Sequence, residues 1–133
     1  MEAIVLEEVE IDAIKNPVLR DRARIGGKAM LTKFFVAKLN QSEVAFLSVD
    51  FFRPPQHFSI YEIFVLMDHR GLGLGTTLLR KAEEMALDAG NTKVSLKPKR
   101  LDTETNSGKL LSWYRRHGYH PMSGSEYLEK IIQ

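Results

Sequence analysis

The segment best suited to chemistry is a glycine-rich loop at residues 70–76, with the sequence Arg-Gly-Leu-Gly-Leu-Gly-Thr. Glycines at three alternate positions let a ligand approach the backbone where a Cβ would otherwise stand. An amphipathic helical segment follows, and the unpaired N–H groups of a helix's first turn attract anions. The spacing fits neither a P-loop nor a G-x-G-x-x-G dinucleotide fingerprint. We therefore expect a phosphate or pyrophosphate site, with a purely structural turn as the alternative.

A carboxylate in an apolar segment is the second candidate. Glu62 lies within the run Ile60–Leu66, and burying a carboxylate costs free energy unless it is paired, hydrated or lines a cavity. Alternation along a strand predicts that Glu62 shares a face with Ile60 and Phe64. Two roles stay open: a general base beside a ligand, or a salt-bridged side chain.

The histidines do not form a metal-binding pattern. His117 and His120 are three residues apart, but Gly118 and Tyr119 between them end the helical spacing. Two histidines without a third ligand are weak evidence for a metal ion. We predict no metal site and assign both histidines to surface or capping roles.

The segments that hold these residues differ in periodicity. Helical periods and runs of β-branched and aromatic residues distinguish helices from strands, and glycines at 90 and 118 mark helix ends. The strand–helix–strand order around the glycine loop predicts a βαβ unit in an α/β fold with a mixed sheet. The expected strands are residues 2–9, 33–39, 43–51, 58–66, 93–97, 119–122 and 127–132, and the expected helices are 17–24, 74–89 and 107–117.

Length and composition limit the class of protein. The 133 residues, 44% hydrophobic and 27% charged, predict one soluble domain covering residues 1–133. With no cysteine, the chain has no disulfide framework, thiolate metal site or cysteine nucleophile. The longest apolar run, Ile63–Met67, is far shorter than the ~20 residues that span a bilayer, and the acidic start is unlike a signal peptide. We therefore expect a cytoplasmic protein without membrane association.

The glycine loop resembles motif A of the GNAT superfamily of acyl-CoA-dependent N-acetyltransferases. That motif reads Gln/Arg-x-x-Gly-x-Gly/Ala, and Arg70, Gly73 and Gly75 match it. Val65 lies five residues before the arginine, as in the family pattern, whereas Met67 replaces the usual proline.

A second resemblance to this family lies in residues 106–119. Tyr114 and Gly118 keep the family spacing of four, and Tyr119 replaces the usual phenylalanine. Asn106 is eight residues before the tyrosine, where seven is commoner. The resemblance covers residues 33–122 and fades over 1–32, where room for one helix instead of two suggests an open acceptor site.

The resemblance implies a fold and a cofactor. The implied fold is a mixed, mostly antiparallel sheet of about six or seven strands flanked by helices. The implied co-substrate is acetyl-CoA, with its pyrophosphate on the loop amides and its pantetheine arm along a splayed strand end. The implied contacts are Phe64, Val65, Arg70, Gly71, Leu72, Gly73, Leu74, Gly75, Thr76, Asn106 and Tyr114.

The resemblance also implies the chemistry. An acetyl group would pass to a primary amine by direct attack in a ternary complex, since no cysteine is present to carry it. The Val65 N–H would stabilise the oxyanion, Tyr114 would protonate the departing CoA thiolate, and Glu62 would accept the amine proton through water.

Other readings of function and partners stay open. A GNAT fold could bind or sense acyl-CoA without turnover. The basic half of the chain could bind nucleic acid, although a net charge of +2 gives this little support. The amine acceptor is unidentified: a small molecule, a lysine side chain or a protein N-terminus. The final strands could pair two copies into a homodimer.

Overall fold

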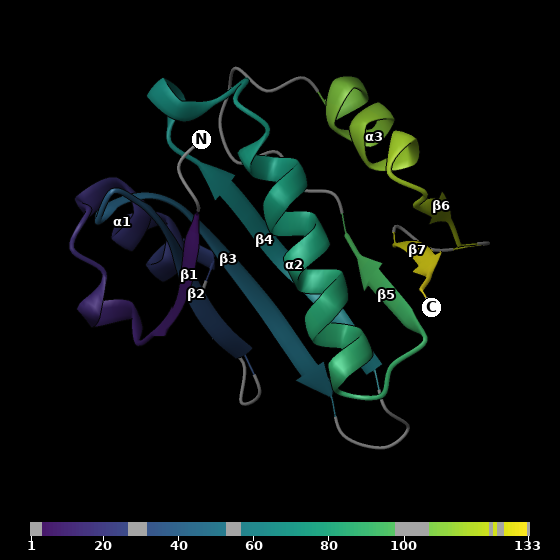
Figure 1. The fold of residues 1–133 in the computed structure, drawn as a ribbon. Helices are drawn as coiled ribbons and strands as arrows, with labels where there is room; N and C mark the ends of the chain where they lie inside the picture. Colours follow the sequence, from purple (N-terminus) through teal and green to yellow (C-terminus); the bar gives the residue numbers. More distant parts are fainter. Residues whose placement is uncertain are drawn as a thin grey trace.

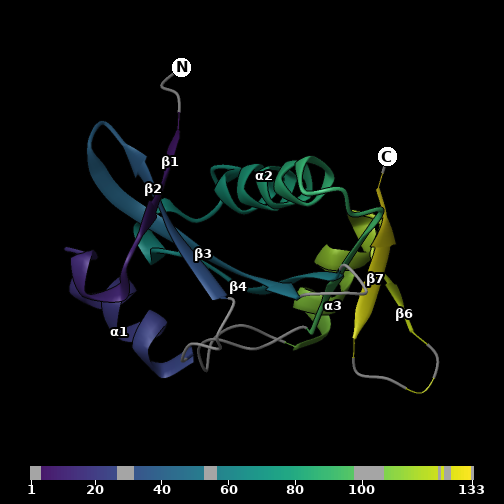
Figure 2. The same ribbon diagram turned by 90° about the horizontal axis from the view of Figure 1, so that it is seen from below.

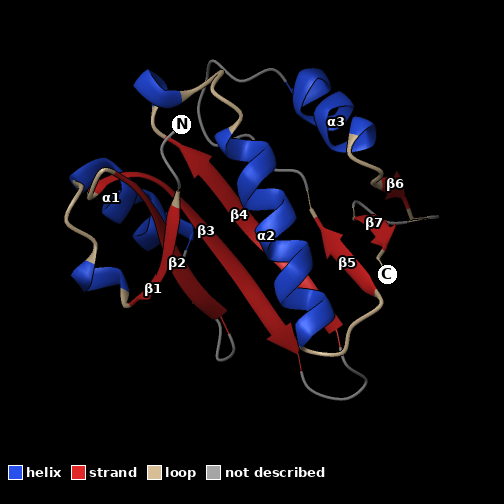
Figure 3. Ribbon diagram, viewed as in Figure 1, coloured by secondary structure: helices blue, strands red, loops and turns tan. Residues whose placement is uncertain are grey.

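A computed structural model describes residues 4–26, 32–52, 57–97, 107–122, 124 and 127–132. Within these residues, seven strands form one sheet in the order β1-β2-β3-β4-β5-β7-β6 (Figures 1 and 3). Only β4 and β5 run parallel; the other neighbours are antiparallel. The strands are β1 (Val5–Val9), β2 (Thr32–Leu39), β3 (Ser42–Phe52), β4 (His57–Val65), β5 (Lys93–Leu96), β6 (His120–Pro121) and β7 (Leu128–Ile131). The helices are α1 (Pro17–Gly26), α2 (Leu74–Asp88) and α3 (Ser107–Arg116), with short 3-10 turns η1 (Ile11–Ala13) and η2 (Met67–His69).

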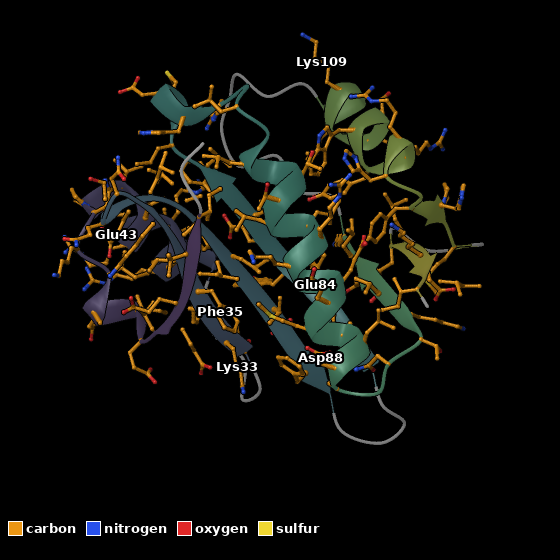
Figure 4. The ribbon with its side chains drawn as sticks, in the orientation of Figure 1. Lys33, Phe35, Glu43, Glu84, Asp88 and Lys109 are labelled. Atoms are coloured by element: carbon orange, nitrogen blue, oxygen red, sulfur yellow. The ribbon has the colours of Figure 1, made fainter. Side chains whose placement is uncertain are left out.

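Helices cover both faces of the sheet. Figure 2 shows α2 on one face and α1 on the other. The apolar side of α2 packs on β3, β4 and β5, whereas Glu84 and Asp88 are exposed on its outer side (Figure 4). On the opposite face, Leu19 and Ala23 of α1 pack with aromatic residues of β2, β3 and β4. The expected mixed, mostly antiparallel α/β fold is confirmed, and β4–α2–β5 is its βαβ unit.

Local signals explain where α1 begins. The Asn16 side chain accepts hydrogen bonds from the N–H groups of Val18 (2.9 Å) and Leu19 (3.1 Å), as an N-cap residue does. Pro17 follows at the first helical position, where its missing N–H costs nothing. The Glu43 carboxylate of β3 also accepts the backbone N–H of Asn16. These contacts fix α1 against the sheet.

The turns lie at the residues expected from the sequence. Asn40 and Gln41 both have positive φ, 51° and 66°, and join β2 to β3 in a two-residue hairpin. Gly90 and Gly118 have φ of 86° and 95°, just beyond the ends of α2 and α3. The last strands are shorter than expected: the Tyr119 N–H still bonds to the helix carbonyl of Tyr114 (3.1 Å). Pro121 has no N–H, and the N–H of the next residue, Met122, bonds to the Tyr127 carbonyl (3.1 Å).

A β-bulge in the central strand corrects the expected alternation. Ser48 of β3 pairs with Glu62, and the next residue, Val49, pairs with Ile60, so Tyr61 is an extra residue in β4. Paired residues share a face. Glu62 therefore lies with Phe64 on the α1 face, while Ile60 lies on the α2 face.

The parallel strands separate just after this bulge. Only Ser59–Ser95 and Ile60–Leu96 are paired between β4 and β5. The next residue of β4, Tyr61, is the bulge, and a bulge bends a strand and increases its twist. The second half of β4 therefore keeps an open edge beside the glycine loop.

Candidate active site

A cavity of about 330 Å³ lies where β4 and β5 part. Its walls are the second half of β4, the loop before α2, the end of β5 and one side of α3. Predicted site residues in these walls are Glu62, Phe64, Val65, Arg70, Gly71, Gly73, Leu74, Gly75, Thr76 and Tyr114. Leu72 is not among them, since its side chain is 66% exposed. Asn106 lies outside the described residues.

Two of the loop glycines leave space for a ligand. Gly71 and Gly73 both have φ of +81°, and nothing stands within 4 Å of the position that a Cβ would occupy on either. Gly73 is the N-cap residue of α2 and makes no side-chain cap hydrogen bond. The first-turn N–H groups of α2 can therefore bond to an anion in the cavity.

The third glycine has a different role. A Cβ on Gly75 would lie 3.3 Å from Cζ2 of Trp113. Gly75 therefore lets the indole of α3 pack against the first turn of α2, and Trp113 forms part of the cavity wall. Gly75 also differs from Gly71 and Gly73 in conformation, since it lies inside α2 and has no positive φ.

The ladder between β3 and β4 orients the backbone at the open edge. The Leu66 N–H donates to the Val44 carbonyl at 2.9 Å. Since hydrogen-bonded pairs alternate along an antiparallel ladder, the Val44–Leu66 bond makes Ala45–Val65 a non-bonded pair. The N–H and C=O of Val65 therefore point away from β3, towards the open side, as do those of Ile63. The Phe64 backbone faces β3, so only its ring can line the cavity.

Arg70 ties the loop to the end of β4. Its Nε donates to the Val65 carbonyl at 3.0 Å. Its guanidinium carbon lies 5.4 Å from the centre of the Phe64 ring, and that of Arg22 lies 5.5 Å from the same ring. Phe64 is thus flanked by two cations, each a favourable contact for an aromatic ring.

Glu62 is both part of the cavity wall and paired with a cation, the two environments considered from the sequence. Its side chain is 4% exposed and lines the cavity. Its Oε2 lies 3.6 Å from an Nη of Arg22, which offsets part of the cost of burial. The sequence does not reveal Arg22, because 40 positions separate the pair and α1 brings them together.

Tyr114 faces the same cavity from α3. It is 7% exposed, and its ring packs edge-on against Trp113 at 4.9 Å. Burial, and then the nearby Glu62 carboxylate, raise the pKa of Tyr114 above the usual tyrosine value. The phenol therefore stays protonated well above neutral pH.

His117 links the last turn of α3 to the first turn of α2. Its Nδ1 lies 2.8 Å from the Trp113 carbonyl, and its Nε2 lies 3.2 Å from the Thr76 hydroxyl oxygen. The capping role predicted for His117 is confirmed by the first contact. The second contact, to a residue of the cavity wall, has no signal in the sequence.

Searches for metal and membrane features cover the described residues only. In those ranges, no three His, Cys, Asp or Glu side chains stand close enough to hold a metal ion. No helix in the same ranges is long and apolar enough to cross a membrane.

A parallel strand pair that parts over a glycine loop defines the fold of the acyl-CoA-dependent N-acyltransferases. The chain belongs to the acetyltransferase (GNAT) family, whose model matches residues 8–119. No curated protein sequence matches the chain significantly.

Solved structures with a similar fold include several acetyltransferases. The IAA acetyltransferase from Bacillus cereus is 22% identical, with a TM-score of 0.74 over 98% of this chain and 100% of that one. A GNAT family acetyltransferase from Elizabethkingia anophelis with acetyl-CoA bound is 15% identical, with a TM-score of 0.71 over 97% and 98%. The PaiA N-acetyltransferase from Thermoplasma acidophilum in complex with coenzyme A is 13% identical, with a TM-score of 0.68 over 98% and 99%. At these identities the likeness establishes the fold.

Proposed function

We propose that this protein transfers an acetyl group from acetyl-CoA to a primary amine by direct attack in a ternary complex. The observation that carries the proposal is one cavity walled by the glycine loop, the open edge of β4, Glu62 and Tyr114. The acetyl-CoA in the Elizabethkingia structure and the coenzyme A in the Thermoplasma structure support the choice of co-substrate.

The glycine loop and the open edge of β4 bind different parts of the cofactor. The pyrophosphate binds the first-turn N–H groups of α2, next to Gly71 and Gly73. The pantetheine arm lies along the open edge of β4, where its amides pair with the backbone of Ile63; at Val65 the carbonyl already accepts from Arg70, and the N–H faces the thioester. Contacts from Phe64, Leu72 and Asn106 stay predictions.

The reacting groups then lie at the end of the pantetheine arm. Glu62 takes the amine proton through a water molecule, and the neutral nitrogen attacks the thioester carbonyl. The Val65 N–H donates to the oxyanion of the tetrahedral intermediate. As the C–S bond breaks, Tyr114, whose phenol is protonated at neutral pH, donates its proton to the departing thiolate.

Calorimetric titration with acetyl-CoA, followed by thiol-release assays on a panel of amines, tests this function. Micromolar binding with transfer to at least one amine is the expected result. Binding without transfer to amino acids, polyamines, lysine peptides or peptide N-termini would instead support a non-catalytic acyl-CoA sensor. No binding at millimolar acetyl-CoA would overturn the proposal.

A further inference from the structure

The contact between α3 and α2 is made by two residues one helical turn apart. Trp113 packs over Gly75, and His117 bonds to the next residue, Thr76. Their rings also stack on each other, with centroids 4.5 Å apart. Thr76 lines the cavity beside the N-terminus of α2. His117 therefore contacts the loop through a residue of the cavity wall.

The partners of the imidazole assign its tautomer. A carbonyl oxygen can only accept a hydrogen bond, so Nδ1 carries a hydrogen towards Trp113. In the neutral ring Nε2 is then bare and accepts the hydrogen of the Thr76 hydroxyl. In the imidazolium ring Nε2 carries a hydrogen and donates to the same oxygen.

These two states turn the Thr76 hydroxyl in opposite directions. Beside a neutral imidazole, the hydroxyl hydrogen is used in the bond to Nε2, so the Thr76 hydroxyl can only accept further hydrogen bonds. Beside an imidazolium, the hydroxyl hydrogen is released and can be donated to a ligand in the cavity. A phosphate oxygen stabilises the imidazolium state in two ways, because it accepts the hydroxyl hydrogen and lies near a positive charge.

We propose that His117 is a positioning residue that couples pyrophosphate binding to proton uptake. As the ligand binds, one proton passes from solvent to Nε2 of His117, and the Thr76 hydroxyl hydrogen turns to a phosphate oxygen. The proposal rests on the proposed function, because it takes the CoA pyrophosphate as the ligand. Because binding then takes up a proton, affinity should fall as pH rises.

Other charged groups lie on the elements around His117. Arginine and lysine side chains keep their charge between pH 5 and 8, and Glu83 pairs with Lys130 at 3.1 Å. Among the residues lining the cavity, His69 is the one histidine, so its contribution must be separated by substitution. The groups concerned are Arg80 and Glu83 of α2, Arg115 and Arg116 of α3, His120 of β6, Lys130 of β7, and His69, Arg70 and Lys97 in the cavity wall.

Calorimetry with dephospho-CoA tests the coupling. This ligand keeps the pyrophosphate but lacks the 3′-phosphate monoester, whose own titration near pH 6 would obscure the result. Binding enthalpies near pH 7 in buffers of different ionisation enthalpy give the number of protons taken up. We expect net uptake of up to one proton, and affinity falling by up to about tenfold per pH unit.

Substitutions at His117 and Thr76 test whether this pair takes up the proton. His117→Gln and Thr76→Val should each abolish uptake, whereas Thr76→Ser, which keeps the hydroxyl, should retain it. His120→Gln is the matched histidine control on β6 and should also retain it. The Thr76 pair keeps the test decisive even if His117→Gln fails to fold.

Three results would overturn the proposal while leaving the acetyltransferase function intact. They are wild-type binding without proton uptake, uptake that persists in His117→Gln or Thr76→Val, and uptake lost in His69→Gln but kept in His117→Gln. Failure to bind acetyl-CoA or dephospho-CoA at all would remove both proposals together.

Discussion

At the level of single side chains, Tyr114 is the residue whose substitution separates binding from chemistry. Tyr114→Phe keeps the ring that packs on Trp113 and removes only the hydroxyl. We expect acetyl-CoA affinity to change little and turnover to fall at least about tenfold. Because its raised pKa keeps Tyr114 protonated, the pH at which activity rises or falls should not move. Steady-state kinetics with parallel calorimetry measure both quantities.

The control for Tyr114 is a tyrosine away from the cavity. Tyr127 is 43% exposed, next to β7, and is not part of the cavity wall. Tyr127→Phe should keep full turnover. Turnover that is unchanged in Tyr114→Phe would remove Tyr114 from the mechanism.

Glu62 is tested by the shape of a pH profile. Glu62→Gln preserves the size of the side chain but cannot accept a proton. We expect lower turnover and loss of the limb over which activity rises from acidic pH, because that limb reports the ionisation of the base. Glu84→Gln, on the exposed side of α2 (Figure 4), is the matched control. An acidic limb that survives Glu62→Gln would contradict the base assignment.

At the level of elements, two alanine substitutions distinguish the glycines of the loop. Gly73→Ala forces a side chain into a left-handed conformation and should destabilise the fold by about 1 kcal/mol. Gly75→Ala has no such strain and gains helix propensity, but its Cβ pushes on Trp113. We expect Gly75→Ala to change stability little and to weaken acetyl-CoA binding, since α3 must shift.

Urea denaturation and acetyl-CoA titration of the two variants check this contrast. Trp113→Phe combined with Gly75→Ala should recover part of the lost affinity, because the smaller ring leaves room for the methyl group. Acetyl-CoA affinity that is unchanged in Gly75→Ala would show that Gly75 is not a packing position.

The elements themselves could be predicted because their signals are local. The hairpin at Asn40–Gln41, the start of α1 and the glycine after α2 depend on residues adjacent in the chain. The helical period predicts the long helix, and the near-continuous apolar run predicts the most apolar strand. The GNAT family assignment followed from the spacing of a few residues and is confirmed by the family model.

The rest could not be predicted because it depends on contacts between distant segments. The bulge at Tyr61 exists only through pairing with β3, and it reverses the face expected for Ile60 relative to Glu62. Arg22 meets Glu62, and His117 meets Thr76, across 40 and 41 positions. The periodicity of a sequence carries no information about such long-range contacts.

At the level of the whole molecule, two buried tyrosines predict loss of stability in alkali. Burial and neighbouring charge raise the pKa values of Tyr114 and Tyr119, the latter beside Glu83. Both hydroxyls hold their protons more tightly in the folded than in the unfolded chain. Their contribution to stability is therefore complete below about pH 10 and is lost as pH rises further, by about 1.4 kcal/mol per pH unit for each.

Urea unfolding between pH 9 and 11 measures this slope. Tyr119→Phe should reduce the slope by about 1.4 kcal/mol per pH unit, the contribution of one proton. It should also lower stability, because the 2.9 Å hydrogen bond to Glu83 is lost. Tyr127→Phe, on the exposed surface, should leave the slope unchanged. A slope that is the same in Tyr119→Phe and the wild type would contradict the prediction.

Trp113 gives the molecule an optical property of its own. It is the single tryptophan of the chain, it forms part of the cavity wall, and its ring lies 4.5 Å from that of His117. Indole emission responds to the polarity of its surroundings and is quenched by an adjacent imidazolium. The intrinsic fluorescence of the unlabelled protein should therefore report both cofactor arrival and the charge of its neighbour in a single spectrum.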